Sequence, residues 1–300
     1  MSSLIFPIVE VRDNKLISIS GNVGYFFKLL PPDLEQMTNL EEMSFFDGIS
    51  QYLDQLTEGS YLKFYSLGGV SYLETNQNTT PELPNVLCVP QNNPLKIFFG
   101  EAELYSDIGI HDDYLSFQGN FWRIMSVKAW GGGEIGIDFM PHEVDYILSI
   151  KRATPDKAMK KLDRIRQGHL SNFFKGKKDI ESEGAYFQAQ ELMEDLTLGL
   201  ESLFSVELFF VVKGLSLEEL KESATYLQHA MATKGVQLLS EGQSLLQLKS
   251  GLPQFFNELI PGVQPRLALR THTDKTTHLR YLLPLQRSHL IDDGILFHGH

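Results

Sequence analysis

The chain has 300 residues, of which 42% are hydrophobic and 21% are charged, so its composition is that of a folded protein with one large or two medium domains. Its net charge of −12 opposes general nucleic-acid binding, because phosphate contacts require clustered Lys and Arg. The longest apolar run, residues 203–212, contains Glu207 and is far shorter than the about 20 residues of a membrane-spanning helix. The lone Cys88 excludes an internal disulfide and, with an N-terminus that lacks a secretory signal pattern, predicts a reducing cytoplasmic location.

The first part of the chain is predicted to be rich in strands and to contain one helix. We expect strands at 6–11, 16–20, 23–30 and 61–67, and a hairpin from 114–117 to 121–127 around Gly119-Asn120. A helix is expected at about 40–57. Thr38 and Glu41 have the spacing of a capping box there, and one apolar face is formed by Phe46, Ile49, Leu53 and Leu56. Residues 75–94 contain four prolines, which predicts an exposed loop.

The second part alternates between strands and helices. Strands are expected at 144–150, 203–213 and 236–239, and helices at about 156–173, 181–202, 216–234 and 244–248. Pro155 favours the first helix start, and Ser216 with Glu219 predicts a cap for the third helix. The buried stripe of that third helix is predicted to be Leu217, Leu220, Ala224, Leu227 and Met231.

This order of elements predicts an α+β fold, with a strand-rich part followed by a ferredoxin-like layer whose helices cover one face of a sheet. We place a boundary near residue 140. The expected division is a mixed subdomain at 1–140, an α+β subdomain at 141–270 and a further segment at 271–300.

The sequence contains partial matches to catalytic and cofactor-binding motifs, but the residues around them do not fit the sites that these motifs form. Gly131–Gly136 matches G-x-G-x-x-G, but an extended stretch follows it where a dinucleotide site needs a helix. Gly176-Lys177 is followed by Lys178, so the sequence has no Walker A phosphate loop. The remaining candidates are interpreted as solvated histidines or turn residues: His289, His298 and His300, and the pairs Asp112-Asp113 and Asp292-Asp293. We therefore predict no catalytic, cofactor-binding or metal-binding residue in this chain.

One local charge feature stands out. Residues 151–178 contain ten Lys or Arg and only two acids, Asp156 and Asp163, so this segment carries +8 and the rest of the chain −20. Its functional interpretation is a docking surface for anionic lipid, nucleic acid or an acidic protein, and its simpler interpretation is a solvated helix face. The surrounding charge of −20 would repel a long polyanion, so lipid or protein is favoured over DNA. The candidate docking residues are Lys157, Lys160, Lys161, Arg164, Lys175, Lys177 and Lys178.

The succession of segments from 142 to 260 resembles a known family. Residues 145–150 are followed by the basic helix, by the stretch from Gly184 to Leu196, by the apolar run 203–212, and by 216–220 with Gly235 closing the next helix. The early strand pair within 11–30, the long helix and residues 61–65 fit the same order. This order is similar to the N-terminal region of type IV secretion ATPases of the VirB4/TraC kind.

The resemblance implies a non-catalytic docking and assembly domain that links an ATP-hydrolysing motor to the inner-membrane secretion complex. In that family a RecA-like motor with Walker motifs follows. The resemblance therefore implies that residues 271–300 lead into such a motor domain, and residues 290–297 look like its lead-in strand. ATP and Mg²⁺ are expected only for the full-length parent. The implied partners are inner-membrane secretion subunits and other copies of the ATPase, without strong nucleic-acid binding by this part. The implied location is the cytoplasmic face of the inner membrane, as a peripheral protein.

Two alternatives from other classes stay open. The chain could be a stand-alone cytoplasmic scaffold or binding protein that is complete at residue 300. It could also be a small-molecule enzyme whose site residues are dispersed, which would require a pocket with convergent polar groups.

Overall fold

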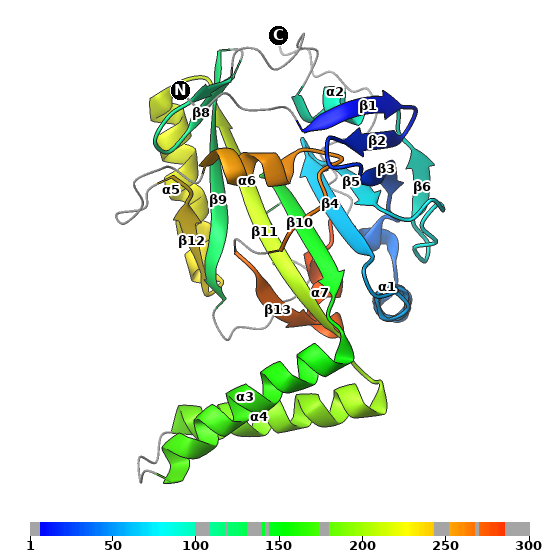
Figure 1. The fold of residues 1–300 in the computed structure, drawn as a ribbon, viewed down its shortest axis with the longest axis vertical. Coiled ribbons are helices and arrows are strands. Elements are labelled where there is room, and N and C mark those ends of the chain that lie inside the picture. The colour runs from blue at the N-terminus through cyan, green and yellow to red at the C-terminus, as the bar shows by residue number, and fades with distance from the viewer. Residues whose placement is uncertain are drawn as a thin grey trace.

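A computed structural model describes residues 7–99, 108–117, 119–130, 140–141, 144–174, 180–242, 252–267 and 270–285. Its centre is a 13-stranded sheet in which the strand pairings are antiparallel (Figure 1). The strands are β1 (Ile8–Arg12), β2 (Lys15–Ser18), β3 (Val23–Leu30), β4 (Tyr61–Leu67), β5 (Val70–Thr75), β6 (Leu87–Pro90), β7 (Gly109–Ile110), β8 (Leu115–Phe117), β9 (Asn120–Trp130), β10 (Asp145–Arg152), β11 (Leu203–Gly214), β12 (Val236–Ser240) and β13 (His272–Lys275).

The helices are placed between these strands. They are α1 (Asn39–Asp54), α2 (Pro94–Phe99), α3 (Pro155–Phe174), α4 (Ile180–Leu198), α5 (Leu217–Thr233), α6 (Leu252–Leu259) and α7 (Thr276–Leu282), with a short 3-10 turn at Leu34–Gln36. The protein is therefore a mixed α+β fold built on a large antiparallel sheet, and the α+β class agrees with the sequence prediction.

The path of the sheet crosses the predicted boundary at residue 140. Its order is β1-β2-β3-β5-β4-β10-β11-β9-β8-β7, with β6 on β3, β12 on β9 and β13 on β11. The strands β4 and β9, which precede residue 140, pair with β10 and β11, which follow it. One continuous sheet thus joins the first and second parts of the chain.

The two faces of the sheet carry separate hydrophobic cores. One core packs the sheet against α1, α5 and α7 and includes Phe46, Leu148, Leu208, Leu227 and Leu279. The other core lies under α2 and α6, where Phe209 on β11 contacts Phe255 on α6. The central strands β10 and β11 contribute to both cores, which is why their sequences are apolar almost throughout.

The helices α1 and α5 confirm the cap predictions. The Thr38 hydroxyl accepts from the Glu41 amide and the Glu41 carboxylate accepts from the Thr38 amide, so the capping box is complete. Ser216 caps α5, although the Glu219 carboxylate accepts from the Leu215 amide rather than from Ser216. The apolar face predicted for α1 is buried in full.

Three sequence predictions need correction. Leu217 was assigned to the buried stripe of α5, but it is 42% exposed because it lies in the first turn of the helix, beside the exposed Leu215. Residues 75–94 are not simply an exposed loop, since they contain β6 and bury Leu83, Val86 and Cys88 in the core. The helices at 156–173 and 181–202 do not cover the sheet, because α3 and α4 project away from it (Figure 1). The helix predicted at 244–248 lies outside the described residues.

Candidate docking surface

The helices α3 and α4 form an antiparallel hairpin, here called the arm, which projects from one end of the sheet (Figure 1). The arm is inserted between the paired strands β10 and β11, whose register continues to the pair Arg152 and Phe204. Beyond that pair, the Ala153 amide donates to the Leu203 carbonyl at 2.8 Å, so the two connections leave the sheet side by side. Pro155 then occupies the first helical position, where its missing amide hydrogen costs no helical hydrogen bond.

A small apolar cluster holds the two helices of the arm together near its root. Ala158 and Leu162 of α3 are buried with Leu203, and the partly buried Leu192, Met193 and Leu196 of α4 pack against them. The two α3 residues are four positions apart, which places them on one side of the helix. Because the cluster lies mostly within the arm itself, the arm has its own packing rather than a broad contact with the sheet.

Arg152 anchors the root of the arm to the body. Its guanidinium donates to the carbonyl oxygens of Asp54 at 2.5 Å and Leu56 at 3.0 Å, at the end of α1, and to the Ser202 hydroxyl at 3.1 Å. From the sequence alone, this residue was only one of ten basic residues. Its structural role was missed because a contact that joins β10 to the end of α1 and to the residue before β11 is visible only in the folded chain.

The predicted docking residues are only partly described by the structure. Lys160 and Arg164 are exposed one helical turn apart on α3. Lys157 and Lys161 also belong to α3, and they are four residues apart. Lys175, Lys177 and Lys178 lie outside the described residues. Arg166, a further basic residue of the segment, is paired with Asp163 at 2.7 Å.

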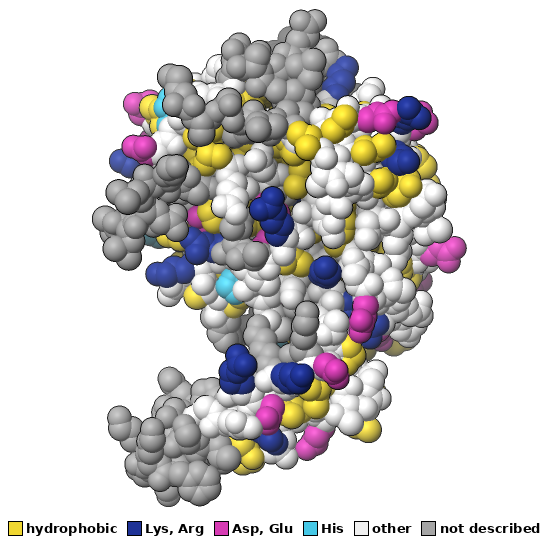
Figure 2. All heavy atoms as spheres, in the orientation of Figure 1, with side chains coloured by type: hydrophobic (Ala, Val, Ile, Leu, Met, Phe, Trp, Pro, Cys, Tyr) yellow, Lys and Arg dark blue, Asp and Glu magenta, His cyan; other side chains and the backbone are white. Residues whose placement is uncertain are grey.

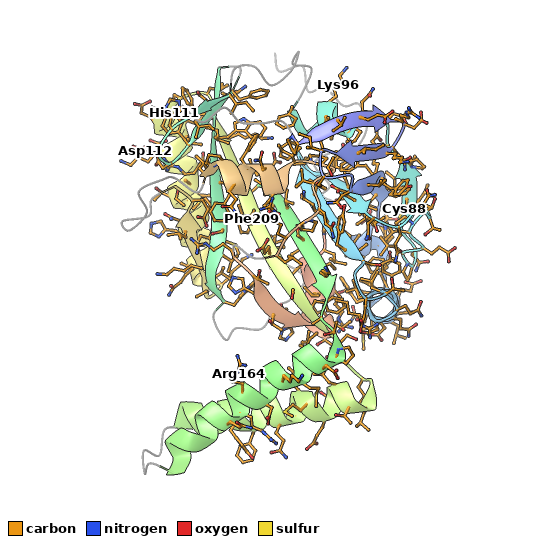
Figure 3. The ribbon with its side chains drawn as sticks, viewed as in Figure 1. Cys88, Lys96, His111, Asp112, Arg164 and Phe209 are labelled. Carbon is orange, nitrogen blue, oxygen red and sulfur yellow. The ribbon has the colours of Figure 1, made fainter. Side chains whose placement is uncertain are left out.

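The exposed basic residues border a hollow in the molecular surface. Figure 2 shows this hollow between the arm and the body, with Lys and Arg side chains along the surface of the arm that faces it. Arg164 points from α3 into the same space (Figure 3). In the half of the arm nearest the body, α3 faces the body and α4 lies on the far side (Figure 1). The basic face of α3 is therefore directed into the hollow between the arm and the body.

A second group of charged residues is buried under α6 and the segment after it. Glu74, Lys63, Ser149 and Glu207 are register partners across β5, β4, β10 and β11, and we call them the charged row. All four are buried, and Lys63 and Glu74 are 0% exposed. Lys63 and Glu207 interrupt otherwise apolar strands, which was the only sequence signal for this row.

The charged row binds the backbone of the segment that covers it. The Lys63 ammonium donates to the carbonyl oxygens of Ile260 at 2.9 Å and Val263 at 3.3 Å. The Glu74 carboxylate accepts from the Gly262 amide at 3.0 Å and from both Tyr61 and Tyr65 hydroxyls. Gly262 has a φ of +86°, and a Cβ atom there would lie 2.7 Å from atoms of Ile8 and Leu16, so glycine is required at this close approach.

Burial shifts the pKa values of this group. Desolvation lowers the pKa of Lys63, while the nearby carboxylates of Glu74, Glu258 and Glu207 oppose that change. Burial also raises the pKa of Glu258 on α6, whose carboxylate accepts from the Arg266 amide at 3.1 Å. Shifted pKa values can mark catalytic sites, but the donors and acceptors named here are taken up within the chain. Glu207 also accepts from the Arg270 amide and the Thr271 hydroxyl, so we assign the charged row to holding residues 260–263 and 270–271 on the sheet.

The other sequence candidates are placed as follows. Asp113 forms an ion pair with Arg123 at 2.7 Å, and Asp112 lies beside it in the turn before β8 (Figure 3). The Gly131–Gly136 motif, Asp292-Asp293 and His289, His298 and His300 lie outside the described residues. Within the described part of the chain, no group of three or more His, Cys, Asp or Glu is arranged to hold a metal ion. None of the described helices combines the length and apolar character needed to cross a bilayer.

Comparison with known proteins does not assign a family. No protein-family model matches the chain, and no curated protein matches it.

Proposed function

We propose that the chain is the non-catalytic docking and assembly part of a type IV secretion ATPase of the VirB4/TraC kind, with the arm as its contact surface. The observation that carries this proposal is the arm itself: a helical hairpin that leaves the sheet and exposes Lys160 and Arg164 on a protein of net charge −12. A charged projection with its own small core adds little to the packing of the body, so contact with another molecule explains it better than stability does.

The expected partner is an acidic segment of an inner-membrane secretion subunit. The sequence left anionic lipid and acidic protein as alternatives, and the direction of Arg164 favours the protein. Because the basic face points into the hollow between arm and body, a peptide-sized or helical segment reaches it more readily than a flat bilayer does (Figures 2 and 3). Attraction of this kind weakens as salt rises, since exposed charges are screened beyond about 10 Å at 0.1 M.

Further parts of the proposal follow from the resemblance. The protein would act at the cytoplasmic face of the inner membrane, ATP and Mg²⁺ would be bound by a motor outside these residues, and other copies of the ATPase would be neighbours. The ferredoxin-like arrangement of residues 141–270 belongs with this proposal as its finer structural prediction; α5 packed on β9, β11 and β12 supports it, whereas the projecting α3 and α4 do not.

The test compares two variants with the same change in net charge. The first replaces Lys157, Lys160, Lys161 and Arg164 with Glu; the control replaces the body residues Arg12, Lys96, Lys128 and Lys221, which are exposed, with Glu. In pull-downs of inner-membrane secretion subunits, the arm variant should lose binding and the control should retain it. If both variants retain binding equally, the basic segment is only a solvated helix face.

Co-sedimentation with vesicles separates the two sources of negative charge. We expect the wild type to bind vesicles containing anionic lipid no better than neutral vesicles. Binding to anionic vesicles that is lost only in the arm variant would instead make the bilayer the partner.

A further inference from the structure

The outer side of α4 differs in charge and chemistry from the basic side of α3. The basic residues of the arm lie in α3 and the connection after it, whereas α4 contains no Lys or Arg and five acids, Glu181, Glu183, Glu191, Glu194 and Asp195. The arm therefore has one basic helix and one acidic helix. The two helices pack against each other through Ala158 and Leu162 of α3 and the partly buried Leu192, Met193 and Leu196 of α4.

Apolar side chains accompany the acids on the exposed side of α4. Phe187, Glu191, Glu194 and Leu198 follow one another at spacings of four, three and four residues, which places them on one stripe of a helix. We call these four residues the outer stripe. All four are exposed, Phe187 by 59% and Leu198 by 72%. Helix α4 therefore has apolar residues on two sides. Leu192, Met193 and Leu196 pack against α3, whereas Phe187 and Leu198 are exposed.

The exposed apolar residues of the outer stripe contribute little to the stability of the chain while they face water. A buried Phe or Leu side chain is worth about 1.5–3 kcal/mol relative to an exposed one, so a partner that covers both Phe187 and Leu198 gains stability from each. Phe187 and Leu198 are 11 residues apart, about 16 Å along the helix, so they offer a partner two separate apolar anchors. The two glutamates between Phe187 and Leu198 determine the charge that such a partner must carry.

We propose that the outer stripe binds a basic amphipathic helix of a protein partner, with its apolar residues on Phe187 and Leu198 and its Lys or Arg on Glu191 and Glu194. Helix-on-helix docking with anchors three and four residues apart is a common mode of recognition. This inference rests on the proposed function for the type of partner. Segments next to the membrane on the cytoplasmic side carry an excess of Lys and Arg, so subunits of an inner-membrane complex offer helices of the required charge.

The two sides of the arm then have separate tasks. The face with Lys160 and Arg164 borders the hollow and receives acidic protein, whereas the outer stripe receives a basic helix. The chain's own α3 is also basic, so a second copy is a competing occupant of the outer stripe, and the experiment must distinguish it.

The probe is a synthetic 20-residue amphipathic helix with a Leu stripe flanked by Lys, measured by fluorescence anisotropy against the whole chain at low salt. Its control peptide keeps the Leu stripe and carries Glu in place of Lys. The wild type should bind the Lys peptide. The Glu peptide should bind at least about tenfold more weakly, and a tenfold loss corresponds to about 1.4 kcal/mol of binding free energy.

Two protein variants divide the contributions of charge and apolar contact. Glu191→Lys with Glu194→Lys should weaken binding of the Lys peptide by about tenfold or more and reduce its salt dependence. Phe187→Ala with Leu198→Ala should weaken binding at all salt concentrations. The four-site Glu variant of α3 should bind the Lys peptide at least as tightly as the wild type does, because it removes positive charge from the arm, and this separates the inference from the proposed function.

Four results would overturn the proposal. The first three are no binding of the Lys peptide by a folded wild type, equal binding by the Glu191→Lys/Glu194→Lys variant, and equal binding of the two peptides. A fourth is sedimentation equilibrium showing a dimer of the free chain that both the α3 and the outer-stripe variants abolish, because the occupant would then be a second copy.

Discussion

Leu227 illustrates how a single buried residue tests the assignment of α5. It is 1% exposed in the core between α5 and the sheet, whereas Leu217 at the start of the same helix is 42% exposed. Leu227→Ala should lower the free energy of unfolding by about 2–5 kcal/mol, because it leaves a cavity in a packed core. The matched change Leu217→Ala should cost well under about 2 kcal/mol. Urea denaturation of both variants provides the comparison, and equal costs would mean that α5 is packed differently.

The burial of Glu258 predicts how its contribution to the stability of the fold depends on pH. Its folded pKa is raised by burial above the ordinary value of 4.5, so the folded state binds its proton more tightly than the unfolded state does. Such a carboxyl stabilises the fold below pH 4.5, and this contribution is lost as pH rises toward the folded pKa. Glu258→Gln keeps a neutral acceptor for the Arg266 amide.

The stability of the Glu258→Gln variant relative to wild type should therefore increase as pH rises above about 4.5 and then level off. Chemical denaturation between about pH 4 and pH 8 measures this difference. A relative stability that falls over the same range would show that the ion pair with Arg266, not desolvation, dominates at this site.

At the scale of elements, the arm should be separable from the body. It is inserted between two strands that already pair with each other, and its main apolar cluster is its own. Replacing residues 155–198 with a short Gly/Ser loop should leave a folded body with a single cooperative unfolding transition and should abolish the proposed binding to secretion subunits. Circular dichroism and thermal unfolding measure the first outcome; loss of cooperative unfolding would show that the arm is part of the core.

Local sequence signals predicted several elements closely and their arrangement less well. The Thr38 and Glu41 pair, the stripe through Leu220 and Leu227, and Pro155 act within one helix, so spacing alone reveals them. The pairing of β4 with β10 joins segments that are far apart in the sequence, and no local pattern specifies it. For the same reason the contacts of Arg152 and of the charged row were not predicted, although Lys63 and Glu207 within apolar strands were visible.

At the scale of the whole molecule, the chain should not bind ATP with micromolar Kd. A phosphate loop needs backbone amides, a Lys and a Ser or Thr in one fixed pattern, and this sequence contains no such pattern. Isothermal titration calorimetry with ATP and Mg²⁺ checks this expectation. Micromolar binding that is removed by a substitution within residues 1–300 would favour the small-molecule enzyme over the docking domain.

Contact between the arm and the secretion complex is tested most directly by site-specific photo-crosslinking in cells that assemble such a complex. A crosslinking residue at Arg164 on the arm is compared with one at Lys221 on α5, which is also exposed. We expect a crosslink from position 164 to an inner-membrane secretion subunit and none from position 221. No crosslink from position 164, or the same product from both positions, would contradict the assignment of the arm as the docking surface.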